Sequence, residues 1–331
     1  TYHELYYYTY NYAEEFTLFL NIQFVTSVMV ASCLALILWI SFRKQYSSPY
    51  SPQSGIFKIF TFGLPLLLLI VVYLGMFKEI EAFWNQRYGE SGVLLHADYG
   101  EYTKYDEDLL NFKTLWLINY SALFALALAL IQMRFIKTTE SMATSLLTNA
   151  LVVFAFVTAG LFELSQLRYS YLNQVDVQYY FRDVNHILIR YIGILLMVPL
   201  VLINYTYIRK NSFPETIRQT ERVLFHTAVL IVLSSELVHW LDMFRVENSF
   251  KLALSILWGA YALFLIVFGL WKDLKYIRIA AIVLFAVTLI KLFLYDMADM
   301  STISKTIVMI ILGALLLTAS FLYNNYKRST G

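Results

Sequence analysis

The chain has 331 residues, of which 59% are hydrophobic and only 15% are charged, and its mean hydropathy is +0.60. Soluble domains carry about a quarter charged residues and cannot bury this much apolar side chain, so the composition excludes an ordinary soluble domain and indicates a membrane protein. The formal net charge is +2, and the single cysteine, Cys33, excludes an internal disulfide and a cysteine metal cluster.

Nine apolar stretches are long enough to cross a membrane as helices, because a spanning helix needs roughly 20 mostly apolar residues. Leu, Ala, Ile and Phe fill these stretches without the alternation of a membrane strand. The sequence therefore predicts an all-α, polytopic transmembrane helix bundle in a single domain. The nine expected spans are residues 18–40, 57–77, 115–136, 147–164, 184–207, 223–241, 249–270, 279–296 and 304–323.

The distribution of basic residues predicts the orientation of this bundle. One set of connections and helix ends holds 14 of the 25 basic residues but only four of the 23 acidic residues. Loops rich in Lys and Arg stay in the cytoplasm, so this set is expected inside a bacterial inner membrane. Nine crossings then place the first residues outside and the last residues in the cytoplasm. The chain opens outside without an entry signal, so we expect it to be the C-terminal part of a longer protein.

The chain also repeats a unit of two helices, in which an acidic and aromatic segment ends the outward-running helix. In the first four units a glutamate followed by Leu or Ile recurs at the same place. In the fifth unit Lys291 takes this place, and Asp296 follows five residues later. The expected units are residues 1–45, 57–137, 147–210, 223–275 and 279–328. The glutamates in register are Glu4, Glu79, Glu163 and Glu236.

The inward-running helices have a pattern of their own, with a basic residue near the start and a small residue deeper in. Small residues let membrane helices approach closely. Each basic residue could form an ion pair with the glutamate of its own unit and close the helical hairpin, or the glutamates could line a shared cavity. The candidates for these pairs are Lys113, Arg190, Lys251 and Lys305, and the small residues are Ser121, Gly193, Gly259 and Gly313.

The densest ionisable cluster is the segment ELVHWLD, where Glu236, His239 and Asp242 follow at intervals of three residues. On a helix they form a slowly drifting stripe that could handle protons, contact a substrate or simply hydrogen-bond at the membrane surface. The spacing matches no metal motif, and the chain has no phosphate loop, dinucleotide glycine pattern or HExxH helix. We therefore expect no metal and no cofactor, and no nucleic-acid partner, because the basic residues are explained by topology and anionic lipid.

Two features of the expected outer side point to ligands. Tyrosines gather there, either as the aromatic belt of a membrane protein or as a stacking surface for a glycan or a lipid headgroup. The long loop at residues 96–110 holds five acidic residues, which are either solvated or able to act in an enzyme. The expected partners are therefore membrane lipids, with a glycan or lipid headgroup at the outer face, or a protein partner or missing N-terminal segment.

The last two units resemble a known family. The motifs W-G-x-Y-A-L, K-x-F-x-x-D, L-G-x-L-L-L and S-F-L-Y between residues 234 and 328 look like the C-terminal region of domain-of-unknown-function family 2339, and they are closest to members from Bacteroidetes. The resemblance implies a long polytopic inner-membrane protein. It implies no reaction, so no catalytic residue is carried over.

The leading functional expectation is a transporter-like or scaffolding protein with a polar, acid-lined cavity that opens outward. One alternative is a cell-envelope enzyme that acts on a lipid-linked or glycan substrate with outer-loop carboxylates. Another is a membrane anchor or assembly subunit. The residues expected to line the cavity are Glu79, Glu163, Glu236, His239, Asp242, Lys291 and Asp296.

Overall fold

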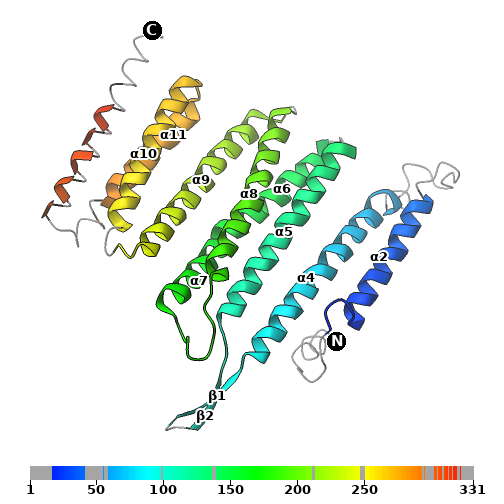
Figure 1. Ribbon diagram of the computed structural model, residues 1–331. Helices are drawn as coiled ribbons and strands as arrows, with labels where there is room; N and C mark the ends of the chain where they lie inside the picture. Colours follow the sequence, from blue (N-terminus) through cyan, green and yellow to red (C-terminus); the bar gives the residue numbers. More distant parts are fainter. Residues whose placement is uncertain are drawn as a thin grey trace. The chain divides into compact units, whose positions relative to one another are not determined.

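Long apolar helices make up most of the computed structural model (Figure 1). The structure describes residues 17–41, 55, 59–97, 100–135, 139–210, 213–246, 250–292 and 294, and separate residues between 302 and 321. The helices are α2 (Ile22–Ser41), α4 (Leu64–Glu90), α5 (Asp108–Phe135), α6 (Thr139–Ala155), α7 (Leu161–Asn173), α8 (Asn185–Lys210), α9 (Glu215–Met243), α10 (Phe250–Trp271) and α11 (Lys275–Lys291). Two π-helical turns, η1 (Ile59–Gly63) and η2 (Phe156–Gly160), precede α4 and α7.

The predicted helical membrane bundle is confirmed, but the described residues hold about seven candidate spans where nine were expected. Seven described helices are long and apolar enough to cross a membrane. The expected eighth span falls on α11, which has only 17 residues and carries basic residues in its first and last turns. The expected ninth span overlaps a shorter apolar helix, Lys305–Thr318. The seven candidates are Ile22–Ser41, Phe60–Glu90, Asp108–Arg134, Ala143–Asn173, Asn185–Arg209, Glu215–Met243 and Phe250–Trp271.

The chain divides into two units, residues 1–200 and 201–331, and each is described by itself. In the first unit α5 packs against α4, α6 and α7, while α2 packs against α4. A buried apolar cluster joins α4, α5, α6 and α7 to the first part of α8. Large apolar side chains such as Leu74 and Leu195 remain exposed, as expected for helices whose solvent is lipid. The buried members of the cluster include Leu115, Ala122, Phe156, Leu164, Leu167 and Leu200.

An antiparallel β-hairpin joins α4 to α5 and projects beyond the ends of these helices (Figure 1). Its strands are β1 (Val93–Ala97) and β2 (Gly100–Lys104), in a register that pairs Leu95 with Tyr102. The loop between α7 and α8 packs on this hairpin, because the Tyr180 hydroxyl donates a 2.8 Å hydrogen bond to the Lys104 carbonyl. We call this end of the first unit the hairpin end.

Small residues bring helices of the first unit close together, as their pattern predicts. A Cβ atom added at Gly193 would lie 2.6 Å from the ring of Phe156. The Ser121 hydroxyl lies 2.9 Å from the hydroxyl of Tyr73 and so joins α5 to α4. Gly313 is different, since a Cβ atom there would meet no atom of the described residues within 4 Å.

The second unit is formed around α9, α10 and α11. An apolar cluster that includes Tyr261, Ile277 and Ala281 joins α10 and α11. Polar contacts add to it, because the Trp258 indole donates a 2.9 Å hydrogen bond to the Ser234 hydroxyl. The Lys291 ammonium donates to the hydroxyl of Ser255, a fully buried residue, at 3.1 Å. Hydrogen bonds of this kind help to join membrane helices, because the hydrophobic effect does not drive helices together in lipid.

Candidate functional site

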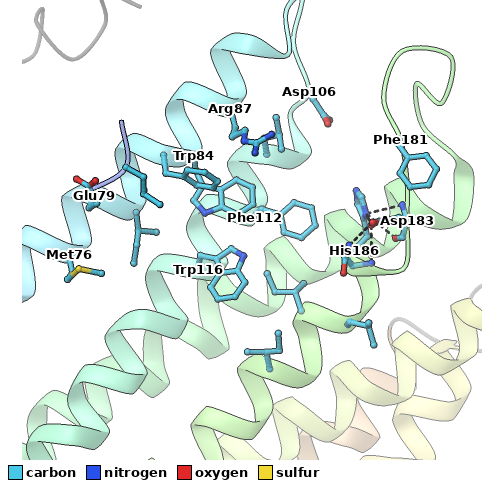
Figure 2. A pocket seen from close by; sticks show the side chains of 18 of the residues that line it. Met76, Glu79, Trp84, Arg87, Asp106, Phe112, Trp116, Phe181, Asp183 and His186 are labelled. Carbon is cyan, nitrogen blue, oxygen red and sulfur yellow. Dashed lines mark hydrogen bonds and ion pairs between the residues drawn. The ribbon is translucent and has the colours of Figure 1, made fainter. Parts of the chain in front are cut away.

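A groove of about 770 Å³ lies in the first unit, near its hairpin end (Figure 2). Its walls come from α4, α5 and the beginning of α8, and the residues before α2 close one side. Most of its side chains are apolar. Those labelled in Figure 2 are Met76, Glu79, Trp84, Arg87, Asp106, Phe112, Trp116, Phe181, Asp183 and His186.

Aromatic rings form the middle of this groove. The rings of Trp84 and Phe112 stack with their centroids 5.6 Å apart and their planes only 10° from parallel. Phe112 also meets the His186 imidazole edge to face at 5.0 Å. Trp116 and Phe181 remain exposed. These flat, rigid surfaces favour binding of an extended apolar chain.

His186 stands at one end of the groove and is the most informative polar residue there. Its side chain is buried, and its Nδ1 atom lies 3.1 Å from a carboxylate oxygen of Asp183. Its Nε2 atom faces a carboxylate oxygen of Asp108 at 3.5 Å and makes no hydrogen bond within the described part of the chain. At 3.5 Å this contact is too long for a good hydrogen bond, so a closer polar group of a ligand would satisfy the nitrogen better.

Behind His186 lies a buried charge cluster, which we call the Arg182 cluster: Asp106, Asp108, Arg182 and His186. The Arg182 Nη1 atom is 2.7 Å from Asp106 and 3.0 Å from Asp108. The second oxygen of Asp108 accepts a 2.9 Å hydrogen bond from the Ser170 hydroxyl of α7. The cluster therefore ties the start of α5 to α7 and to the α7–α8 loop. Removing one member of such a buried group would leave a charge uncompensated.

A second, more polar pocket of about 450 Å³ lies beneath the β-hairpin and is lined in part by Asp108 and Arg182 of the Arg182 cluster. Lys104 donates a 2.5 Å hydrogen bond to Asp176, and this bond raises the pKa of Lys104 above its ordinary value of 10.5. Desolvation raises the pKa of the nearby Tyr180 phenol. The pocket lining consists of Tyr102, Thr103, Lys104, Tyr105, Glu107, Asp108, Ser170, Val175, Asp176 and Arg182.

The structure places Glu79 at the opposite end of the groove from His186 (Figure 2). Its buried carboxylate accepts hydrogen bonds from the backbone N–H of Phe19 and from the side-chain amide of Asn21. The expected partner, Lys113, donates instead to the Asn85 side chain at 2.9 Å. The hairpin of α4 and α5 is thus held by other contacts than a Glu79–Lys113 pair.

The other predicted residues of the first unit lie away from the groove lining. Glu163 is half-buried in the first turn of α7. Arg190 lies one turn beyond His186 in α8 and is almost completely buried. The structure therefore brings Glu79 to the groove without Glu163 beside it, so a shared cavity of equivalent glutamates stays a prediction.

In the second unit, Glu236, His239 and Asp242 share the last turns of α9, with His239 buried and the two acidic residues half-buried. Lys291 ends α11, where its ammonium contacts the Lys251 carbonyl at 3.5 Å as well as Ser255. Lys305 is half-buried in its short helix. Glu4 and Asp296 lie outside the described residues.

The sequence analysis did not identify Arg182, and it did not predict that Asp106, Asp108 and His186 lie together beside a groove. One signal was available: acidic residues at the start of one inward helix, and an Arg and a His four residues apart at the start of the next. These starts were expected at the same membrane surface. Within the described part of the chain, no three His, Cys, Asp or Glu residues are grouped so that they could hold a metal ion.

Comparison with known proteins identifies the family but no reaction. The family described as "Predicted membrane protein (DUF2339)" matches residues 5–326. Neither the curated proteins nor the solved structures give a match. The match covers nearly the whole sequence, as the motifs near the C-terminus suggested. The chain therefore belongs to the DUF2339 family of predicted membrane proteins.

Proposed function

We propose that this chain is a bacterial inner-membrane protein that binds a lipid, or another amphiphile, in the groove between α4, α5 and α8. The observation that supports this proposal is an apolar groove, lined by stacked aromatic rings, that ends at the buried His186 imidazole. Within the described residues, the Nε2 atom of this imidazole makes no hydrogen bond and has only a 3.5 Å contact with Asp108. An apolar chain fits the rings of Trp84 and Phe112, while a polar group can reach His186. This role replaces an acid-lined polar cavity with an amphiphilic groove.

The groove is placed where lipid can enter it. Leu188 and Ile192 of α8 line it and are 49% and 39% exposed. Both belong to a candidate membrane span, so the groove faces hydrocarbon along this side. From the bias of Lys and Arg we also propose that the hairpin end lies at the outer surface of the inner membrane. An odd number of crossings, whether seven or nine, leaves the two chain ends on opposite sides.

One observation favours an enzyme as the second candidate. Two carboxylates, Asp106 and Asp183, line the lipid-accessible groove, and Asp183 lies beside the His186 imidazole. A histidine oriented by a carboxylate can serve as a general base toward a substrate hydroxyl. His186→Gln would then stop any chemical change in a lipid incubated with the protein. Retention without such a change in the unaltered protein favours lipid binding or transport.

Filling the groove tests the proposal. The full chain is purified in detergent, and its co-purified lipids are compared by mass spectrometry with the lipids of the source membrane. We expect one lipid class to be enriched, and Leu188→Trp to reduce this enrichment several-fold because the indole occupies the groove. Leu195→Trp is the matched control, since Leu195 lies on the same helix, is 73% exposed and is not part of the groove lining.

Two results would overturn groove binding. One is a co-purified lipid mixture with the same composition as the source membrane. The other is an enriched lipid class that Leu188→Trp and Leu195→Trp leave equally abundant.

A further inference from the structure

The polar pocket beneath the β-hairpin combines exposed aromatic faces with carboxylates. Tyr102 and Tyr105 of the hairpin line it and are 43% and 37% exposed. Tyr105 is held by stacking on Tyr88 at 5.1 Å, so its position is fixed before any ligand arrives. Glu107 and Asp176 add acceptor oxygens at the same pocket. Aromatic faces attract the C–H side of a sugar ring, and carboxylates accept hydrogen bonds from its hydroxyls.

The charges of this pocket disfavour an anionic ligand. Its lining holds three carboxylates, Glu107, Asp108 and Asp176, but only two cations. Both cations are already engaged: Lys104 binds Asp176, and Arg182 binds Asp106 and Asp108. A phosphate would thus meet net negative charge, whereas an uncharged, hydroxyl-rich ligand would meet acceptors that it can satisfy.

The position of the pocket links it to the groove. Asp108 and Arg182 line the polar pocket, while Asp106 and His186 line the groove, and all four belong to the Arg182 cluster. The cluster therefore borders both an apolar compartment and a polar compartment. An amphiphile whose apolar part lies in the groove brings its headgroup to this cluster, beside the polar pocket.

We infer that the polar pocket binds the uncharged glycosyl headgroup of a lipid whose apolar part occupies the groove, an assignment that rests on the proposed lipid binding. Tyr102 supplies the stacking face, and the carboxylates at the pocket accept hydrogen bonds from sugar hydroxyls. No covalent step is involved. The ligand class is a glycolipid with a neutral sugar, in contrast to an anionic phospholipid.

Binding titrations with three defined lipids test this inference. The full chain, in a detergent without a sugar headgroup, is titrated with monoglucosyl diacylglycerol, with diacylglycerol of the same acyl chains and with phosphatidylglycerol, and binding is followed by thermophoresis. We expect the glucosyl lipid to bind about tenfold more tightly than the other two, equivalent to about 1.4 kcal/mol. A detergent with a maltoside headgroup should compete with the glucosyl lipid.

Single-residue variants test whether the polar pocket is the origin of the preference for the glucosyl lipid. Tyr102→Ala should abolish the preference for the glucosyl lipid, while Tyr102→Phe should keep it because the ring remains. Tyr169→Ala is the matched control, since Tyr169 is an exposed tyrosine of α7 that lies outside the polar pocket lining. Leu188→Trp should weaken all lipids that enter the groove.

The outcomes separate this inference from the proposed function. Equal affinity for all three lipids, each weakened by Leu188→Trp, overturns the glycosyl pocket and leaves groove binding in place. Preference for phosphatidylglycerol also overturns it, because it shows recognition of an anion. Absence of saturable binding for every lipid overturns both. A glucosyl preference that Tyr102→Ala leaves intact overturns the assignment of the pocket.

Discussion

The carboxylate of Glu79 accepts hydrogen bonds at 2.9 Å on both oxygens from the side-chain amide of Asn21, which lies 58 residues earlier in the chain. The contact fixes the start of α2 against α4. It also satisfies an acid that is only 4% exposed inside an apolar helix. A buried carboxylate without such donors would be strongly disfavoured.

Asn21→Leu should therefore destabilise the protein, because it leaves the Glu79 carboxylate with fewer donors. The expected loss is about 1–3 kcal/mol, the usual cost of an unsatisfied buried polar group. Thermal unfolding of the purified full chain in detergent measures it. Gln23→Leu, an exposed position at the start of the same helix, is the control and should leave the melting temperature unchanged. Equal melting temperatures for both variants would contradict the role of Asn21.

Replacing Arg182 should loosen the hairpin end. Arg182→Met leaves Asp106 and Asp108 buried without their shared cation, at an expected cost of about 3–5 kcal/mol. Because Arg182 also bonds to the Val175 carbonyl, the α7–α8 loop should become open to proteases. Limited proteolysis with identification of cuts between residues 174 and 184 measures this. Adding Asp106→Asn should restore part of the protection, and a double variant cleaved as fast as Arg182→Met would speak against charge imbalance as the cause.

Gly193→Ala should destabilise the first unit, because the new methyl group would lie 2.6 Å from the Phe156 ring. Overpacking of this kind costs about 1–3 kcal/mol. Phe156→Leu should rescue the variant in part by removing the ring. Gly313→Ala provides a matched control, since a Cβ atom there meets no atom of the described residues within 4 Å. The measurement is again thermal unfolding, and a loss of similar size in both glycine variants would refute the close approach.

The Lys104–Asp176 bond should be visible in amine reactivity. Since the pKa of Lys104 is raised, its ammonium persists to higher pH than an ordinary lysine, and less neutral amine is present at pH 9. The bond therefore contributes to stability below pH 10.5 and is lost as the pH rises through the raised value. Asp176→Asn should increase the acetylation rate of Lys104 at pH 9, measured by peptide mass spectrometry against Lys275 as internal reference. An unchanged rate would argue against the bond.

The helices could be predicted because a helix that crosses lipid must be a long apolar segment. Such a segment is recognised from the mean hydropathy of about 20 consecutive residues. The number of spans could not be fixed equally well. The eighth candidate is an apolar run, but its helix α11 ends at Lys291 after 17 residues. Whether such a helix crosses depends on its neighbours and not on its own hydropathy.

The site was predicted only in part, for a physical reason. Glu79 is conspicuous because a carboxylate inside an apolar run is costly, so it must have a purpose or a partner. Its partner is an uncharged amide, Asn21, which no charge pattern reveals. Arg182 and Asp106 lie 76 residues apart, and both occur in polar connections where ionisable residues are ordinarily solvated. Only the packing of the α7–α8 loop on the β-hairpin brings them together.

The sharing of one guanidinium by two aspartates has a consequence for cooperativity. Asp106 borders the groove, Asp108 borders the polar pocket, and Arg182 contacts both. An occupant that draws Arg182 toward one carboxylate weakens its hold on the other. Occupancy of the two compartments is then thermodynamically linked, and by reciprocity each changes the affinity of the other by the same factor.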